Sequence, residues 1–308
     1  MAETRSLTYP LVTIAIPAYK SRFLREAMLS ALDQNYDNLE LVIVNDHSPD
    51  DIYAVVNSFD DPRIRYYENE RNLGKESIVL NWNKCLEYAQ GEFFVLLCDD
   101  DMLDKDFVTN LFALAERYPY CDVFHSRTRI FDNEINVVKG VTPEWPEWES
   151  FELFASQELT GVKHHTITEF MFRTRAIREK GGYVVFPAGY YSDTASVLRF
   201  VDCGGICSYK EPLATYRKNE ECISSRSDFV CEKSQAALEF YQWIQKEYSR
   251  FISKSDIDDL LDFDLASYFM DAMFIDSLKV LKMIPKSVWP LRKKSALLFK
   301  KIKKEYGA

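Results

Sequence analysis

Two groups of acidic side chains each follow a short apolar run. The run Leu39–Val44 leads into Asn45–Asp51, and the run Phe93–Cys98 leads into Asp99–Asp101. Three adjacent carboxylates repel one another unless a cation lies among them. Hard oxygen ligands of this kind suit Mg²⁺ or Mn²⁺, which would also hold the phosphates of a substrate. The alternative is a solvated acidic turn that caps a helix starting near Asp104, since aspartate favours helix starts.

The acidic groups are placed by apolar runs that alternate with helical patterns through the first half of the chain. Strands are predicted at 11–16, 39–44, 64–67, 93–98 and 122–130, and helices at 22–34, 52–59, 76–89 and 105–118. This alternation is typical of βαβ units, so we predict an α/β fold with a mostly parallel, Rossmann-like sheet flanked by helices. In such sheets ligands bind beyond the carboxyl ends of the strands, where both acidic groups lie.

The second half of the chain is less regular. Prolines and tryptophans in 141–159 predict a loop and a short helix. Beyond them we expect a strand at 166–173, a helix at 192–201, and short strands at 205–209 and 213–216. From about residue 229 the pattern is helical to the end, with breaks at Pro285 and Pro290. We therefore predict a catalytic domain over 1–225 and a helical C-terminal extension over 226–308.

Charge is distributed unevenly along the 308 residues, whose net charge is −10. The segment 277–308 has ten Lys or Arg and one acid, a net +9, so the remainder carries −19. A body this acidic argues against binding nucleic acid over a broad surface. The basic tail also contains apolar residues and Trp289, a composition typical of helices that lie on anionic membranes. The alternatives are a helical cap on the catalytic domain and a dimerisation arm.

Cysteine usage and apolar runs indicate the compartment. The seven cysteines form no CxxC pair, which favours a reduced, cytoplasmic protein. Met1–Thr8 lack the apolar core of a signal peptide, and no apolar run approaches the roughly 20 residues that span a bilayer. We expect a cytoplasmic location, with the basic tail as a peripheral contact at the inner face of the plasma membrane.

Eight segments occur in an order and spacing that resemble the inverting glycosyltransferases of family 2, which have the GT-A fold. They are IPAYK (16–20), LELVIVNDHSPDD (39–51), NLG (72–74), NWNKCLEYAQGEF (81–93), LLCDDDMLDKDF (96–107), FMFRTRAIREKGGY (170–183), YSD (191–193) and EPLATYRKNEECIS (211–224). The resemblance covers roughly residues 10 to 225. It implies transfer of a sugar from a nucleotide-sugar, expected to be a UDP-sugar, to a hydroxyl of a glycan or lipid-linked acceptor, with Mn²⁺ or Mg²⁺ as cofactor. Bacterial capsule or O-antigen synthesis is the setting that the family implies.

The resemblance implies donor-binding roles for residues near the first strands. Pro17 and Tyr19 would line the nucleotide pocket, with Tyr19 stacking near the base. Asp46 would accept a hydrogen bond from the N–H of the uracil ring, for which a charged acceptor is well suited.

The family commonly has Asp-x-Asp-Asp where this chain has Cys98, Asp99, Asp100 and Asp101. In this register Asp100 is the expected metal ligand, with Asp101 beside it, and Cys98 replaces the first aspartate. Asp99 would compensate by contacting the ribose or the sugar of the donor.

Asp193 matches the catalytic base of the family. An ionised aspartate could take the proton of the acceptor hydroxyl as that oxygen attacks the anomeric carbon, giving inversion. The alternative is an N-cap, since Ser192 and Asp193 precede a helix predicted from Thr194. Both roles are compatible.

Further candidates have weaker signals. Lys75 would reach a phosphate or the base, or is simply solvated. Tyr216 and Arg217 match a Tyr-Arg pair near the family's site, where Arg217 would neutralise a phosphate. A histidine often follows two residues after that arginine, and this chain has Asn219 there.

The acceptor side is expected from the irregular middle of the chain. Trp145 and Trp148 lie where the family has a variable acceptor loop and would offer a platform to a sugar, or else pack the loop. His164 and His165 precede a predicted strand and would contact the acceptor, or else serve as structural residues.

Two other functions are compatible with parts of this pattern. A sugar nucleotidyltransferase shares a related fold, but 16–20 is not the Gly-rich, basic phosphate loop that such enzymes carry. A catalytically inactive homologue that acts as a binding or scaffold subunit is favoured by Cys98 and Asn219, and disfavoured by the retention of Asp46, Asp100 and Asp193.

Overall fold

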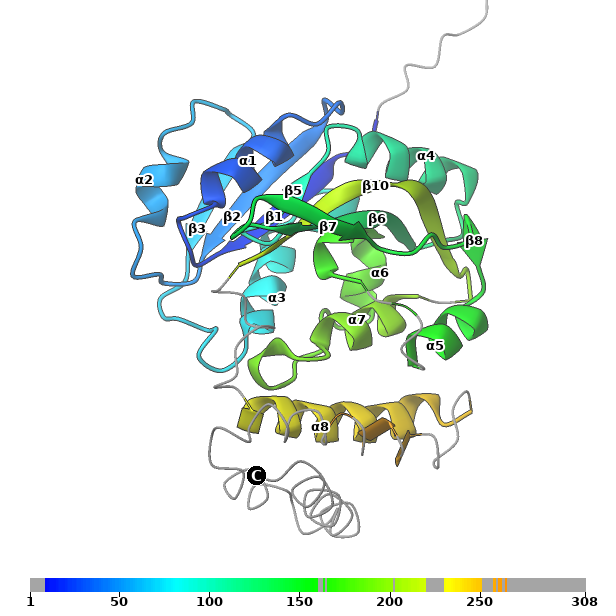
Figure 1. Cartoon of the computed structure of the whole chain (residues 1–308). Coiled ribbons are helices and arrows are strands. Elements are labelled where there is room, and N and C mark those ends of the chain that lie inside the picture. Colours follow the sequence, from blue (N-terminus) through cyan, green and yellow to red (C-terminus); the bar gives the residue numbers. More distant parts are fainter. Residues whose placement is uncertain are drawn as a thin grey trace, which may run out of the picture.

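The computed structural model describes residues 9–159, 163, 165–201, 203–219, 230–250, 257–258, 260–261 and 264. Its centre is a mixed sheet (Figure 1). The strands are β1 (Val12–Ala18), β2 (Leu39–Asn45), β3 (Ile64–Glu68), β4 (Phe93–Leu96), β5 (Met102–Leu103), β6 (Val123–Asp132), β7 (Val137–Val141), β8 (Trp148–Glu149), β9 (Phe170–Arg173) and β10 (Ile206–Lys218). The helices are α1 (Leu24–Leu32), α2 (Ile52–Val56), α3 (Ile78–Tyr88), α4 (Phe107–Arg117), α5 (Phe151–Leu159), α6 (Thr174–Glu179), α7 (Ser192–Phe200) and α8 (Val230–Tyr248), with 3₁₀ turns at Ile167–Glu169 and Pro187–Gly189.

The sheet has the strand order β3-β2-β1-β4-β9-β6-β10-β5, with β7 on β6 and β8 on β10. The first four strands in this order are parallel, and β9 is antiparallel to both β4 and β6. Because β1, β2 and β4 are parallel neighbours, their carboxyl ends meet at one edge of the sheet. The predicted α/β fold is confirmed.

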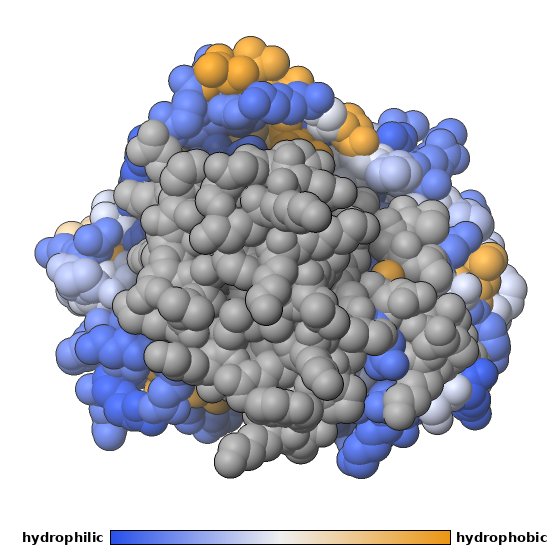
Figure 2. Space-filling view, turned by 60° about the horizontal axis from the view of Figure 1, so that its bottom comes forward, coloured by the Kyte–Doolittle hydropathy of each residue, from blue (hydrophilic) through white to orange (hydrophobic). Residues whose placement is uncertain are grey.

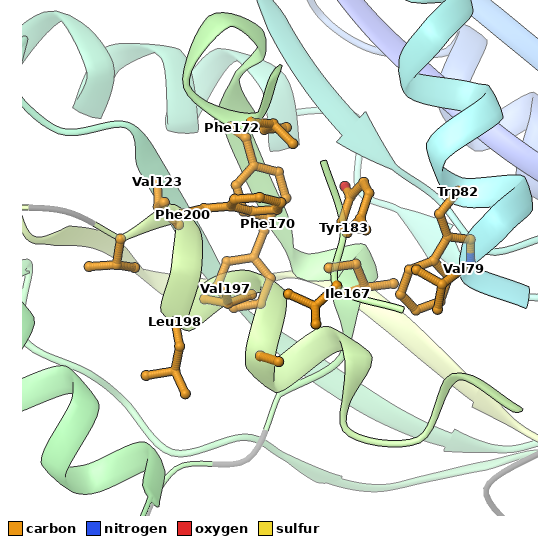
Figure 3. Close-up of a cluster of buried hydrophobic side chains, with 14 of the residues drawn as sticks. Val79, Trp82, Val123, Ile167, Phe170, Phe172, Tyr183, Val197, Leu198 and Phe200 are labelled. Atoms are coloured by element: carbon orange, nitrogen blue, oxygen red, sulfur yellow. The ribbon is translucent and has the colours of Figure 1, made fainter. Parts of the chain in front are cut away.

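Both faces of the sheet are covered, which explains why the strands read as continuous apolar runs. Along β2, Leu41 and Ile43 face the core under α1, α2 and α4, whereas Val42 and Val44 face the core under α3 and α7. On the second face Phe170, Phe172 and Phe200 pack with Tyr183 beside Trp82 of α3 (Figure 3).

The second half differs from the sequence prediction, which did not include α6 or the 3₁₀ turn at Pro187–Gly189. The strand predicted at 166–173 is a 3₁₀ turn followed by β9, and the predicted loop contains β8. The two short strands predicted at 205–209 and 213–216 are one strand, β10, whose register against β6 shifts on either side of Pro212. Proline has no N–H to give to a ladder, so the chain bulges there and continues.

Helix α8 packs on the α/β domain rather than standing apart from it. It lies beyond α7 from the sheet (Figure 1), and Ala236, Ala237 and Ile244 are buried in the core that contains Val197 of α7. The boundary at 225 stays a prediction, and the basic tail lies outside the described residues.

The described surface is mainly hydrophilic in the view of Figure 2, with small separate apolar spots. Within the described part of the chain, no helix has the length and apolar character required to cross a membrane.

The start of β4 has no room for a side chain at Gly91. A Cβ there would lie 2.5 Å from the backbone nitrogen of Thr13 and 2.8 Å from the carbonyl oxygens of Leu11 and Phe93. We expect Gly91→Ala to lower the free energy of unfolding by roughly 1–3 kcal/mol, because β1 and β4 must separate to admit the methyl group. Urea denaturation measures this loss. Gly140→Ala is the control, since a Cβ at Gly140 meets no atom within 4 Å; equal losses in the two variants would contradict the steric argument.

Candidate active site

A cleft of about 510 Å³ opens at the carboxyl ends of β1, β2 and β4. It brings together most of the residues that the sequence singled out. Those lining it are Pro17, Tyr19, Asp46, Asp99, Asp100, Asp101, His165, Asp193 and Tyr216. Lys75, Trp145, Trp148 and Arg217 are not among its lining residues, and His164 lies outside the described residues.

Asp46 follows β2 and holds the loop 69–74 against the cleft. Its Oδ1 accepts hydrogen bonds from Asn69 Nδ2 (2.9 Å) and from the backbone N–H of Leu73 (2.8 Å), and its Oδ2 accepts one from Gly74 N–H (2.7 Å). A Cβ on Gly74 would lie 3.1 Å from Asp46 Oδ2, so glycine permits this close approach. A carboxylate has about four acceptor positions, and these three bonds leave one on Oδ2.

Asp99 ties the end of β4 to the segment that follows β1. Its Oδ2 accepts hydrogen bonds from the backbone N–H groups of Tyr19 and Lys20, both 2.8 Å long. Burial and the charge of Asp100 raise the pKa of Asp99 to about 6, although the two N–H donors favour the charged form. Asp99 therefore positions Tyr19 at the cleft.

Asp101 turns toward the protein and is 2% exposed. Its Oδ2 accepts from Thr168 Oγ1 (2.7 Å) and its Oδ1 from the backbone N–H of Arg217 (2.9 Å). Burial and the charge of Asp100 raise the pKa of Asp101 well above its ordinary value. Because Asp101 is buried and protein donors contact both of its carboxylate oxygens, we propose that it supports the acidic loop rather than binding the metal as expected.

Arg217 lies behind the acidic loop with 4% of its surface exposed. Its Nε donates to the carbonyl oxygen of Asp100 (2.9 Å), one terminal nitrogen donates to Asn133 Oδ1 (2.9 Å) and the other pairs with Glu26. The guanidinium also lies 4.2 Å from the ring centroid of Phe23. The expected phosphate contact does not fit this orientation, because the planar fork is directed at protein groups.

Asp100 is the carboxylate best placed for a metal. Its Oδ2 accepts from the amide of Asn219 (3.0 Å), the residue that stands where the family often has histidine. Within the described residues, no group of three or more His, Cys, Asp or Glu side chains could hold a metal ion. One carboxylate still fits Mg²⁺ or Mn²⁺, since these ions are commonly bound by one or two carboxylates together with substrate phosphates.

Asp193 lies in the first turn of α7 and lines the same cleft as the acidic loop. The N-cap is Tyr191, so the predicted capping role for Ser192 and Asp193 is wrong by one to two residues. Asp193 Oδ1 accepts from the backbone N–H of Thr194 (2.8 Å). Burial raises the pKa of Asp193, and the positive charge of His165 opposes that rise.

His165 is a charged neighbour of the proposed base. Its side chain is 1% exposed, lines the cleft, and places Nε2 3.0 Å from Glu158 Oε1. Burial lowers the pKa of His165, but the charges of Glu158, Asp193 and Glu169 outweigh burial and raise it to about 9. The imidazole is therefore cationic at neutral pH.

The two tryptophans do not form a platform in the cleft. Trp145 is 5% exposed, stacks on His125 with ring centroids 3.8 Å apart, and carries Lys163 Nζ 3.7 Å from its ring. Trp145 therefore packs its loop against the protein, which was the alternative to a platform for the acceptor sugar. Trp148 donates to the carbonyl oxygen of Gly204 (2.8 Å) beside the start of β10, whereas Tyr216 lies near its end.

Lys75 is exposed, which fits its solvated alternative. The cleft also contains residues to which the sequence analysis assigned no role: Lys20, Asn72, Gly74, Ile78, Asn81, Trp82, Cys98, Thr166, Ile167, Ala188, Gly189, Tyr190 and Tyr191. Several of these residues lie inside the segments that resemble the family, and this resemblance could have identified them from the sequence. Thr168, which donates to Asp101, lies outside the segments that resemble the family. Its partner is 67 positions away in the sequence, so no local pattern indicated this bond.

The family model described as glycosyl transferase family 2 matches residues 13–181. The chain belongs to glycosyltransferase family 2. Among curated relatives, it is 33% identical over 118 residues to the GalNAc(5)-diNAcBac-PP-undecaprenol beta-1,3-glucosyltransferase of Campylobacter jejuni, a match that covers 37% of each chain. An uncharacterized glycosyltransferase of Haemophilus influenzae is 28% identical over 129 residues, covering 38% of this chain and 50% of the relative. The chain thus matches half or less of the length of these relatives.

Solved structures confirm the GT-A fold. TarS 1-349 of S. aureus in complex with UDP-GlcNAc aligns with a TM-score of 0.65 and 16% identity, covering 97% of this chain and 91% of TarS 1-349. The mannosyltransferase PcManGT of Pyrobaculum calidifontis, in complex with GDP-Man and Mn²⁺, aligns with a TM-score of 0.59 and 15% identity, covering 96% and 87%. At these identities the likeness concerns the fold.

The contacts of Arg217 with Asp100, Asn133 and Glu26 predict a loss of stability when this residue is changed. Arg217→Lys keeps a positive charge but cannot reach Asp100, Asn133 and Glu26 at once, so we expect the free energy of unfolding to fall by about 2–3 kcal/mol. Arg129→Lys is the matched control, because Arg129 pairs with Asp104 (2.9 Å) while both side chains are about one-third exposed, at 31% and 39%. Its loss should stay below about 1 kcal/mol. Urea denaturation of both variants measures these losses. Similar losses in the two variants would argue against a special role for the contacts of Arg217.

The charge of His165 predicts a shift in pH dependence. His165→Gln removes a cation that lowers the pKa of Asp193, so that pKa should rise and the acidic limb of the kcat/KM profile should move to higher pH. His47→Gln is the control, since His47 is exposed and pairs weakly with Glu68 at 3.7 Å. An unchanged limb in the His165 variant would show that its charge does not act on the base.

Proposed function

We propose that this protein transfers a sugar from a nucleotide-sugar to an acceptor hydroxyl with inversion at the anomeric carbon. The observation that carries the proposal is that Asp100 and Asp193, 93 positions apart in the sequence, line one cleft. An acidic loop for the donor diphosphate and a separate carboxylate for the acceptor are the two parts that this reaction needs.

The donor side is formed by the ends of β1, β2 and β4. The free acceptor position on Asp46 Oδ2 suits the ring N–H of uracil, and the TarS complex contains UDP-GlcNAc, so a UDP-sugar is the proposed donor. Lys20 lines the same cleft and would offset phosphate charge. Asp99 orients Tyr19 toward the nucleotide and does not itself need to contact the ribose or the sugar.

Asp100 would hold Mn²⁺ or Mg²⁺ together with the donor phosphates, as the Mn²⁺ in the PcManGT complex supports. When bound, the ion neutralises charge on the departing diphosphate. Arg217 and Asn219 fix Asp100 from behind, through its carbonyl and carboxylate oxygens respectively.

On the acceptor side, Asp193 would take the proton of the attacking hydroxyl. Burial raises the pKa of this carboxylate, and the charge of His165 opposes that rise, which favours the ionised base that proton removal needs. His165 also lines the cleft, where it would contact the acceptor.

The acceptor is proposed to be a glycan or a lipid-linked sugar in bacterial polysaccharide biosynthesis. The Campylobacter relative is named for a substrate linked to undecaprenol diphosphate. Contact of the basic tail with the inner face of the plasma membrane would bring a cytoplasmic enzyme to such an acceptor.

Departures from the family pattern do not remove the site. Burial and the charges of Asp101 and Asp100 raise the pKa of the Cys98 thiol, which keeps it neutral beside the carboxylates. Asn219 donates directly to Asp100 rather than leaving it unsupported. These contacts favour an active enzyme over a scaffold subunit.

Release of UDP from a panel of UDP-sugars, with Mn²⁺ or with EDTA, tests the proposal. We expect metal-dependent release from one sugar, and at least a roughly 100-fold loss in Asp100→Asn and in Asp193→Asn. Asp193→Asn should keep the rise in melting temperature that UDP and Mn²⁺ produce, because its carboxylate lies on the acceptor side. Asp33→Asn, an exposed carboxylate after α1, is the control. Absence of both UDP release and any thermal shift would overturn the UDP-sugar proposal.

A further inference from the structure

The segment before α7 has an unusual backbone. Tyr191, the N-cap of α7, has φ +60° and ψ 0°, and Ala188 and Gly189 also have positive φ values of +50° and +81°. A bulky residue in the left-handed region is strained by about 1–3 kcal/mol, so surrounding contacts must maintain it. Tyr191 lies two positions before Asp193, and its carbonyl oxygen accepts the N–H of Ala195 (2.9 Å) in the first turn of α7.

Residues from the C-terminal region contact both the ring and the hydroxyl of Tyr191. Its ring stacks on Phe240 of α8, with centroids 4.8 Å apart and planes within 14°. Its hydroxyl donates to Asp264 Oδ2 (2.7 Å), and the hydroxyl of Tyr241 donates to the same oxygen (2.8 Å). With the ring stacked and the hydroxyl bonded, the side chain cannot rotate without losing both contacts.

The part of the segment before Tyr191, residues 186–190, packs between α3 and α8. Lys233 of α8 places Nζ 5.1 Å from the ring centroid of Tyr190, and Phe186 packs edge-on against Phe240 at 6.1 Å. On the other side, a Cβ on Gly189 would lie 2.6 Å from Ile78 Cγ1 of α3. The segment thus has little freedom to move apart from α8.

The acidic loop takes its support from elsewhere. Asp99 is held by the N–H groups after β1, Asp100 by Asn219 and Arg217, and Asp101 by Thr168 and Arg217. These contacts come from the segment after β1, the 3₁₀ turn before β9 and the end of β10, whereas those of Tyr191 come from α8 and Asp264.

We propose that Asp264 and Phe240 are positioning residues that set the place of Asp193 through Tyr191. The inference rests on the function proposed above. Both residues lie beyond the segment 13–181 that matches the family model, so this support belongs to the C-terminal extension of this chain. The bond from Tyr191 to Asp264 fixes the left-handed N-cap, and the N-cap fixes the first turn of α7. Tyr190 and Tyr191 also line the cleft, so the same contacts shape the acceptor-side wall.

Tyr191→Phe and Asp264→Asn test this inference, measured as UDP release and sugar transfer alongside wild type. Tyr191→Phe keeps the stacked ring and removes the hydroxyl, so we expect kcat to fall about 10-fold while KM for the donor and the thermal shift with UDP and Mn²⁺ stay at the wild-type values. Asp264→Asn keeps the shape of the side chain with a weaker acceptor and should have a smaller effect in the same direction. Tyr241→Phe is the matched control: it removes a hydrogen bond to the same oxygen from a residue outside α7, and kcat should stay within about 2-fold.

Hydrogen–deuterium exchange gives a readout that does not depend on activity. Amides at 194–197 should exchange about 10-fold faster in Tyr191→Phe than in wild type or Tyr241→Phe, whereas amides at 99–103 should be unchanged. Unchanged exchange at 194–197, equal kcat in the two tyrosine variants, or a parallel rise in donor KM would overturn the positioning role. An inactive wild type would instead defeat the proposed function, and the exchange experiment would still decide whether Asp264 supports α7.

Discussion

Asp99, Asp100 and Asp101 follow the end of β4, and the repulsion among these three adjacent carboxylates must be offset by the rest of the structure. The fold provides donors from three separate segments: the backbone after β1, the 3₁₀ turn before β9 and the end of β10. Each carboxylate therefore has its own partners, and their directions differ. Asp99 and Asp101 are turned toward protein donors, and Asp100 is the carboxylate that we propose for a metal.

The acceptor side solves a different electrostatic problem. A buried aspartate tends to take up a proton, and a protonated aspartate cannot act as a base. The cation at His165, itself maintained by Glu158, opposes that tendency at Asp193. Two groups of carboxylates in one cleft thus have different partners and different proposed tasks, as is common where neighbouring acids divide the chemistry.

Helix α8 belongs to a folded core that extends further along the chain than the segment matched by the family model. The match ends at residue 181, within the turn before the segment that carries Asp193. Yet the core continues through α7 into α8, and the contacts of Phe240 and Asp264 reach the N-cap of α7. Residues beyond the match also support the acidic loop, since Arg217 and Asn219 both donate to Asp100.

The sequence by itself determined the α/β fold and the two acidic groups at strand ends, because buried parallel strands and helices have local periodicities that are read within a few residues. Through segments that resemble the family it also singled out Asp100 and Asp193, and both residues line the cleft. Only the tertiary structure decided that Arg217 points behind the acidic loop, that Asp101 faces Thr168, and that Trp145 is buried on His125. Arg217 and Asp101 are 116 positions apart, and their bond depends on β10 reaching the end of β4. The direction of such a side chain is set by partners that the local sequence does not contain.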